Sequence, residues 1–199
     1  MRYIYFFILL AYFFCAPPAN IKYNDRGVEH YEKGELNKAI EQYKLAIQNK
    51  PKDADAHYNL GLVYDKKGEW DNAIGEYKKV IQYRPKDVDA YNNLGVDYFE
   101  KGDWKSAEES YLLAIQNKPD FSIAHKNLGV VYEKQSKAEK AIEEYNLAIK
   151  YKPKYINAHF NLAALYLNKG MKKEGCQHLY KAKEFGDKES KELFEKHCL

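Results

Sequence analysis

The sequence repeats itself every 34 residues, and this period constrains the fold more than any other feature. An Asn-Leu pair followed by a small residue returns at this interval: Asn59-Leu60-Gly61, Asn93-Leu94-Gly95, Asn127-Leu128-Gly129 and Asn161-Leu162-Ala163. Prolines keep the same interval at Pro51, Pro85, Pro119 and Pro153. Two unrelated residue types that share one period indicate a chain built from copies of a single structural unit.

Each unit contains two segments with the hydrophobic spacing of an amphipathic helix. In residues 54–87, the apolar positions of the first segment are Ala56, Leu60, Val63 and Tyr64. This spacing places them on one face of a helix, and residues 73–81 repeat it. Gly68 provides a turn between the segments, and Pro85 ends the second because its ring cannot continue the hydrogen-bond pattern. The sequence therefore predicts an all-α fold made of helical hairpins.

Small and large side chains recur at matching positions of successive units. Where the two helices of a unit should approach most closely, the small pairs are Gly61 with Ala73, Gly95 with Ala107 and Gly129 with Ala141. Two tyrosine series provide bulk between units: Tyr64, Tyr98 and Tyr132, and Tyr77, Tyr111 and Tyr145. We expect close packing of small against large residues at each junction.

This pattern resembles the tetratricopeptide repeat (TPR) family over residues 20–189. The resemblance implies an α-α superhelix of five hairpins, with the units 20–53, 54–87, 88–121, 122–155 and 156–189. The first unit departs from the family pattern at Arg26 and His30, and the fifth at Gly175, Leu179 and Asp187. Terminal units of such arrays are often atypical because one of their sides faces water.

The residues from Asp187 to Leu199 are predicted to form a capping helix with Asp187 at its N-cap, and 190–199 lie beyond the fifth unit. Cys176 lies ten residues before Gly186, and Cys198 lies eleven after Asp187. Two antiparallel helices that turn here would bring the cysteines together, so a disulfide is predicted if their α-carbons come within about 7 Å. The alternative is a pair of buried free thiols. The segment also resembles the ends of exported bacterial TPR proteins.

Residues 1–19 differ in character from the rest of the chain. Met1-Arg2 gives a positive start, and Tyr3 to Cys15 is an uncharged apolar run. This run is shorter than the roughly 20 residues that a membrane-spanning helix needs, which favours a signal peptide and export to the periplasm, the envelope or the medium. One alternative is a membrane anchor formed by residues 3–16. Another is a lipid on Cys15, as in bacterial lipoproteins.

The charge balance argues against nucleic acid as a partner. Lys and Arg number 32 and Asp and Glu 29, which gives a net charge of +3 at pH 7. Positive and negative residues alternate along the chain, whereas nucleic-acid binding needs concentrated positive charge.

No catalytic motif is present in the sequence, so we expect neither an enzyme nor a cofactor. G-x-S-x-G, H-E-x-x-H, C-x-x-C and a phosphate-binding glycine loop are all missing. His57, His125 and His159 share one position in their units, which is typical of packing residues in the first helix. Because they are separated by whole repeats, they are too far apart to share a metal ion at about 2 Å each.

The asparagines Asn59, Asn93, Asn127 and Asn161 form the most informative polar column. In TPR proteins this position lines the concave groove, so the resemblance implies a row of amides that faces a bound segment. An amide offers both a donor and an acceptor to an extended peptide backbone. The alternative is that these amides are solvated or bonded locally. The neighbouring groove candidates are Tyr58, Asn92, Lys126 and Phe160.

Together these features predict a non-enzymatic scaffold that binds a peptide or protein segment in its concave groove. One alternative is a membrane-tethered assembly or accessory factor of an envelope complex, and another is a subunit that completes an enzyme elsewhere. Because this fold serves many purposes, the function depends on the particular residues of the groove.

Overall fold

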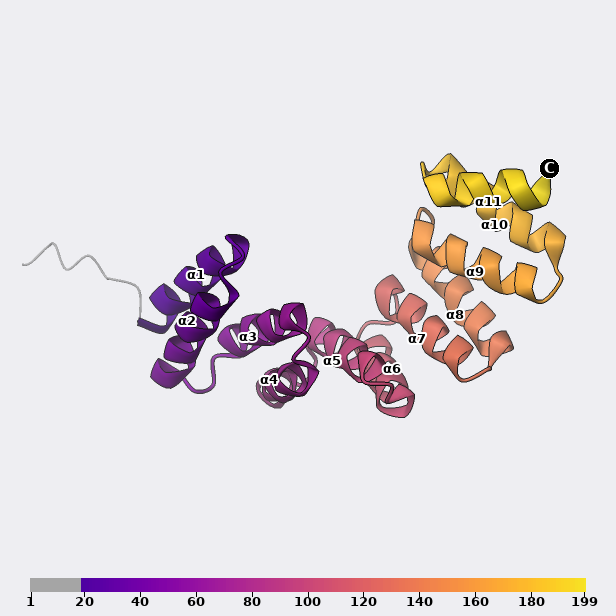
Figure 1. Cartoon of the computed structure of the whole chain (residues 1–199). Coiled ribbons are helices and arrows are strands. Elements are labelled where there is room, and N and C mark those ends of the chain that lie inside the picture. Colours follow the sequence, from indigo (N-terminus) through magenta and orange to yellow (C-terminus); the bar gives the residue numbers. More distant parts are fainter. Residues whose placement is uncertain (1–18) are drawn as a thin grey trace, which may run out of the picture.

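Residues 19–199, the part of the chain that the computed structural model describes, form α-helices joined by short turns (Figure 1). In chain order these helices are α1 (Ala19–Glu32), α2 (Leu36–Asn49), α3 (Ala54–Lys67), α4 (Trp70–Tyr83), α5 (Val88–Glu100), α6 (Trp104–Asn117), α7 (Ser122–Lys134), α8 (Ala138–Tyr151), α9 (Ile156–Asn168), α10 (Lys172–Glu184) and α11 (Lys188–Cys198). No strand occurs between residues 19 and 199.

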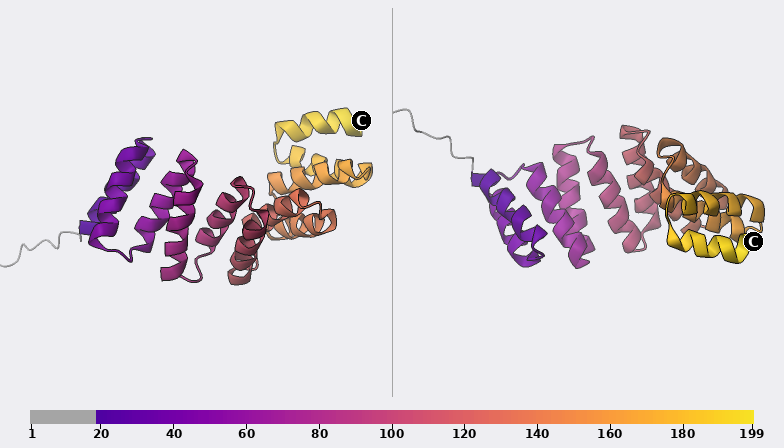
Figure 2. Two further views of the ribbon diagram at one scale, coloured as in Figure 1. Left: turned by 60° about the horizontal axis from the view of Figure 1, so that its bottom comes forward. Right: turned by 90° about the horizontal axis from the view of Figure 1, so that it is seen from above.

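Consecutive helices pack as five antiparallel hairpins, from α1 with α2 to α9 with α10, and α11 packs on α10. The hairpins stack side by side into an elongated, curved array, which two further views show (Figure 2). Each hairpin contacts the next one along the chain. The predicted all-α superhelix of hairpins with a C-terminal capping helix is therefore confirmed.

The turn inside each hairpin depends on one residue with a left-handed backbone. Gly68 follows α3 with a φ of 72°, and its N–H bonds back to the last turn of the helix. Glycine suits this position because it has no Cβ to clash. In the fourth hairpin the same position holds Ser136, which adopts a φ of 59°. Its side chain makes that conformation cost about 1 kcal/mol.

The prolines explain where the second helices end. Helix α4 ends at Tyr83, two residues before Pro85, and Arg84 adopts the extended angles φ −131° and ψ 80°. A proline ring disfavours the helical conformation of the residue before it. The connection between hairpins therefore begins one residue before each proline.

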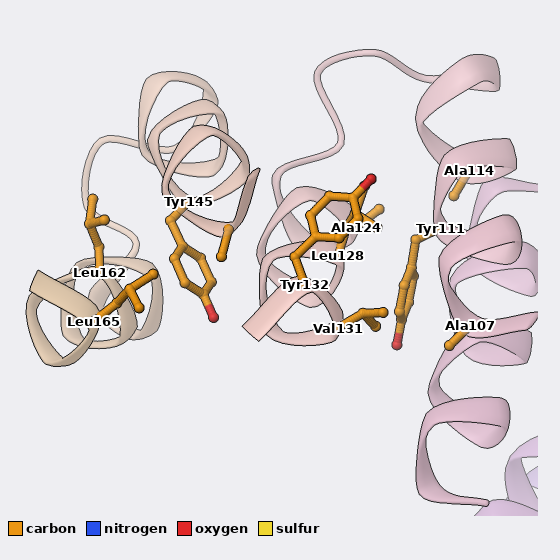
Figure 3. Close-up of a cluster of buried hydrophobic side chains, with 11 residues drawn as sticks. Ala107, Tyr111, Ala114, Ala124, Leu128, Val131, Tyr132, Tyr145, Leu162 and Leu165 are labelled. Carbon is orange, nitrogen blue, oxygen red and sulfur yellow. The ribbon is translucent and has the colours of Figure 1, made fainter. Parts of the chain in front are cut away.

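Tyrosines of the second helices fill the junctions of the array. Tyr77, Tyr111 and Tyr145 are buried, with exposed fractions of 0%, 2% and 0%. Each ring lies against a glycine of the first helix in its own hairpin: a Cβ built on Gly95 would lie only 2.6 Å from Tyr111 Cε1. Tyr111 also reaches from α6 toward Val131 of the next hairpin (Figure 3). The glycines therefore leave room for the tyrosine rings.

We expect Gly95→Ala to lower the free energy of unfolding by about 1–3 kcal/mol, because the buried Tyr111 ring has no space into which it can move. The matched control is Gly75→Ala in the middle of α4, where an added Cβ would meet nothing within 4 Å. That change should raise stability by up to about 1 kcal/mol, since alanine favours helix. Urea unfolding followed by circular dichroism measures both. Equal effects at the two sites would contradict the packing argument.

The C-terminal helix begins as predicted. The Asp187 side chain accepts a hydrogen bond from the Ser190 backbone N–H at 2.8 Å, which confirms Asp187 as the N-cap of α11. Cys176 of α10 and Cys198 of α11 lie in disulfide geometry, with their α-carbons 5.7 Å apart. This separation falls within the range that a disulfide needs. The formation of the bond remains a prediction, which is developed in the Discussion.

Three predictions concern the N-terminus: the signal peptide of residues 1–19, the anchor in residues 3–16 and the lipid on Cys15. Apart from Ala19, where α1 begins, these residues lie outside the part of the chain that the structure describes. Among residues 19–199, no helix has both the length and the apolar character that crossing a membrane requires.

Candidate functional site

The predicted groove residues lie on the first helices of four successive hairpins. They are Tyr58 and Asn59 on α3, Asn92 and Asn93 on α5, Lys126 and Asn127 on α7, and Phe160 and Asn161 on α9. Neighbouring first helices contact one another: α5 contacts α7, and α7 contacts α9. This close approach places them on the inner side of the curved array. We call the surface formed by α1, α3, α5, α7 and α9 the first-helix face.

Hydrogen bonds join these side chains from one hairpin to the next. The Asn59 amide donates to Asn24 Oδ1 at 3.1 Å. One unit further, Asn93 Nδ2 donates to the Tyr58 hydroxyl at 3.1 Å. Asn127 Nδ2 in turn donates to Asn92 Oδ1 at 2.9 Å. We call these three links the amide ladder.

Bonds within helices α5 and α7 extend the amide ladder. Asn92 Nδ2 donates to Asn93 Oδ1 at 3.3 Å, and Lys126 Nζ donates to Asn127 Oδ1 at 2.5 Å. Burial lowers the pKa of Lys126. The bond to Asn127 holds the Lys126 amino group against the ladder. One connected network therefore joins Tyr58, Asn92, Asn93, Lys126 and Asn127, whereas Asn59 bonds to Asn24 and none of these bonds includes Asn161.

The first-helix face is hollowed near its C-terminal end. A cleft of about 290 Å³ is lined by Lys126, Phe160 and Asn161, together with Asp187 and Glu189. Three predicted residues thus meet around one cleft, whereas Tyr58, Asn59, Asn92 and Asn93 lie further along the face. Asp187 and Glu189 were not assigned to a site from the sequence. They reach the cleft because α11 folds back onto the end of the array.

Acidic side chains also join this face in the second and fourth hairpins. The Tyr77 hydroxyl donates to Asp65 Oδ2 at 2.5 Å, and the Tyr145 hydroxyl donates to the Glu133 carboxylate. Asn93 Nδ2 also reaches the Tyr77 hydroxyl, at 3.4 Å, so the amide ladder continues into the first of these pairs. Burial, followed by the nearby carboxylate, raises the pKa of both tyrosines, which keeps them neutral donors.

A second carboxyl group lies behind Asp65, in the core. Asp97 is fully buried at the position that Val63 and Val131 occupy in the neighbouring hairpins. None of the described residues donates a hydrogen bond to either of its carboxylate oxygens. Burial and the adjoining Asp65 carboxyl raise the pKa of Asp97 to about 9. Two carboxylates cannot bond to each other unless one carries a proton, so we expect the pair to hold one proton at neutral pH.

The histidine column packs inside the hairpins. His57 Nε2 lies 2.9 Å from the Pro51 carbonyl oxygen and its Nδ1 lies 2.6 Å from Glu76, while His125 makes the same contacts with Pro119 and Glu144. Both ring nitrogens are therefore engaged. Although burial opposes charging, the Glu76 carboxylate and the Pro51 carbonyl raise the pKa of His57 overall. Within residues 19–199, no three His, Cys, Asp or Glu side chains are grouped as metal ligands.

Stacked helical hairpins with a polar inner face define a helical-repeat solenoid, a class whose concave surfaces bind other molecules. The chain belongs to the tetratricopeptide repeat family. The sequence profile described as TPR repeat matches residues 27–68, 64–96 and 134–170. A second profile, described as Tetratricopeptide repeat, matches residues 88–121. Repeats of this family typically form protein-interaction scaffolds without catalytic activity.

Solved structures share the arrangement along most of the chain. A crystal structure of MamA is 28% identical, with a TM-score of 0.76 over 88% of this chain and 96% of that one. The protein pilF of Pseudomonas aeruginosa is 23% identical, with a TM-score of 0.77 over 85% and 78% of the two chains. YrrB, described as a TPR protein with an unusual peptide-binding site, is 20% identical, with a TM-score of 0.70 over 89% and 92%. The last two similarities show the fold alone. No curated protein matches the sequence significantly.

Proposed function

We propose that the protein is a non-enzymatic scaffold that binds an extended peptide or protein segment along its first-helix face. The observation that carries this proposal is the amide ladder, because each of its three links joins a polar side chain of one first helix to an asparagine of the next. The family supports it, since TPR proteins bind protein or peptide partners. The description of YrrB as a peptide-binding TPR protein agrees with it.

The ladder can bind a backbone because its amides are only partly used. Each asparagine amide has two N–H donors and a carbonyl with two lone pairs. The links use one donor each of Asn59 and Asn127, whereas Asn93 donates to both Tyr58 and Tyr77. A donor therefore remains on Asn59 and on Asn127, and each of the three carbonyls keeps a lone pair for a ligand. Since these links already fix the side chains, the protein loses less side-chain entropy when it binds a peptide than a mobile surface would. Phe160 and the Tyr58 ring add apolar contact area on the same face.

To test the proposal, we would select peptides from a phage-displayed library against the full chain and measure their affinities by fluorescence polarisation. Asn93→Ala with Asn127→Ala should weaken the selected peptides about tenfold or more, because two amide contacts of about 1 kcal/mol each are lost. The same change breaks two bonds between hairpins, so stability should fall by about 1 kcal/mol per site.

The matched control is Asn49→Ala with Asn117→Ala. These asparagines lie at the ends of second helices, where each donates one hydrogen bond to the backbone, at 2.8 Å. This variant also loses two hydrogen bonds but leaves the first-helix face intact. Peptide affinity should therefore stay within about twofold of the unsubstituted protein. Equal affinity loss in the two double variants, or none in either, would rule out the ladder as the binding surface.

We also propose that the protein is exported, which the apolar run from Tyr3 to Cys15 supports. The facing cysteines Cys176 and Cys198 fit this location, because disulfides persist in oxidising compartments. A membrane-tethered accessory factor of an envelope complex, anchored by residues 3–16, is the alternative that the same run supports. In either case the first-helix face would be available to a partner outside the cytoplasm.

A further inference from the structure

We propose a second binding site, separate from the first-helix face, which takes an acidic peptide segment that carries an aromatic or large aliphatic side chain. The site is a cleft of about 940 Å³ at the C-terminal end of the array, and we call it the terminal cleft. Its lining includes Lys172, Lys173, His178, Tyr180, Lys181 and Phe194.

The terminal cleft belongs to a different surface from the amide ladder. Most of its lining comes from α10, the second helix of its hairpin, and Phe194 comes from α11. The ladder residues all lie on first helices. A ligand in the terminal cleft would therefore leave the amide ladder free, so the two sites can be tested independently.

The floor of the terminal cleft is aromatic and open. Tyr180 is 43% exposed, and its ring lies 5.7 Å from that of Phe194, measured between centroids. The position of Tyr180 within its repeat corresponds to Lys78 on α4, where the side chain is charged and well solvated. Covering an exposed tyrosine and the aromatic ring beside it with an apolar side chain removes apolar surface from water, which favours a ligand with such a side chain.

The charged residues of the terminal cleft are all lysines, which selects for an anionic ligand. They are Lys172, Lys173 and Lys181. Lys181 pairs with Glu184 at 2.8 Å. No carboxylate within residues 19–199 forms an ion pair with Lys172 or Lys173, although ion pairs are frequent elsewhere on the array. Two ammonium groups beside an aromatic floor complement carboxylates that flank an apolar residue.

A neutral histidine on the wall favours a peptide over a lipid. His159 Nε2 lies 3.1 Å from the Pro153 carbonyl, which can only accept, so this nitrogen carries the proton and His159 Nδ1 is an acceptor. His178 Nδ1, 3.0 Å away, must then be the donor, which leaves His178 Nε2 as an acceptor. Burial and the nearby His159 lower the pKa of His178 to about 4, so the ring stays neutral. An acceptor suits the backbone N–H of a peptide, whereas a lipid tail has no donor to offer.

The test uses four labelled peptides of the form Glu-Glu-X-Glu-Glu, in which X is Phe, Tyr, Leu or Ala, and fluorescence polarisation with the full chain. The Phe peptide should bind about tenfold or more tightly than the Ala peptide, since burial of the ring supplies that difference. Its affinity should fall as salt is added, because exposed lysines are screened. Lys172→Glu with Lys173→Glu, and separately Tyr180→Ala, should each weaken the Phe peptide about tenfold or more.

Two matched variants act as controls. Lys78→Glu with Lys79→Glu makes the same charge change on α4, and Asn93→Ala with Asn127→Ala removes the amide ladder. Both variants should bind the Phe peptide as tightly as the unsubstituted protein does. If peptides did not bind the first-helix face, the proposal for the terminal cleft would therefore be unaffected. The proposal is overturned if none of the four peptides binds, if the two lysine variants weaken binding equally, or if phosphatidylglycerol vesicles bind the terminal cleft and the peptides do not.

Discussion

Replacing Asp97 with Val should raise the free energy of unfolding by about 1–4 kcal/mol at neutral pH. Asp97 is fully buried, and its oxygens receive no hydrogen bond from the described residues. A buried carboxyl group that receives no hydrogen bond from a donor destabilises the folded state. Val63 and Val131 fill the same position in the adjoining hairpins and are also fully buried, so the site is shaped for a branched apolar side chain.

The stability gained by Asp97→Val should grow as the pH rises. The ordinary pKa of an aspartate is about 4, whereas burial and Asp65 raise that of Asp97 to about 9 in the folded protein. Between these values the folded state holds a proton that the unfolded chain has released, so stability falls with increasing pH. Below about pH 4 the folded and unfolded states are both protonated, and above about pH 9 both have lost the proton. Outside this range stability therefore no longer depends on pH through this group. Asp97→Val removes most of this slope.

Urea unfolding at several pH values between about 5 and about 9 measures the effect. The groups that face Asp97 are Asp65, Glu100, Tyr77 and Tyr111, and both tyrosines stay neutral in this range because burial raises their pKa. Asp97→Asn is the control, because it removes the titrating group but keeps a polar side chain. It should flatten the pH dependence with a smaller gain in stability. A destabilised Asp97→Val, or an unchanged pH dependence, would contradict the shared proton.

Loss of the predicted disulfide should have a comparable effect in the opposite direction. Cys176 and Cys198 are separated by 22 positions, and a cross-link that closes a loop of this size stabilises a protein by about 3 kcal/mol. Cys198→Ser should lower the free energy of unfolding by that amount, with α11 released first because it packs only at the end of the array.

A reducing agent provides the control for this prediction. Under reduction the unsubstituted protein should become as unstable as Cys198→Ser, and the variant itself should not change. Mass spectrometry of the native protein would show the loss of two hydrogens, and it would also identify the mature N-terminus. Two free thiols in protein from an oxidising compartment, or identical unfolding curves without reductant, would show that the cysteines only pack against each other.

The two binding sites place different demands on this fold. The first-helix face spans five hairpins, so a segment bound along it would couple them to one another. The terminal cleft involves only α9, α10 and α11. If the cysteines are bonded, the bond joins the two helices that form most of the terminal cleft, so reduction should weaken peptide binding there and leave the first-helix face unchanged.

The repeat determined most of the architecture from sequence alone. A residue's position within a 34-residue unit fixes its helix and its face, so the hairpins, the turn at Gly68 and the asparagine column all follow from spacing. The Asp97 anomaly was also readable, as an acid in a column where Val63 and Val131 stand.

Only the tertiary structure decided which side chains meet. The bond from Asn93 to Tyr58, the contact of Asp97 with Asp65 and the arrival of Asp187 beside Lys126 each join different hairpins or the cap. These meetings depend on the angle and distance at which separate helices pack, to within about an ångström for a hydrogen bond. Periodicity fixes positions along and around a helix, but the relative placement of two helices is set by the side chains that fill the space between them.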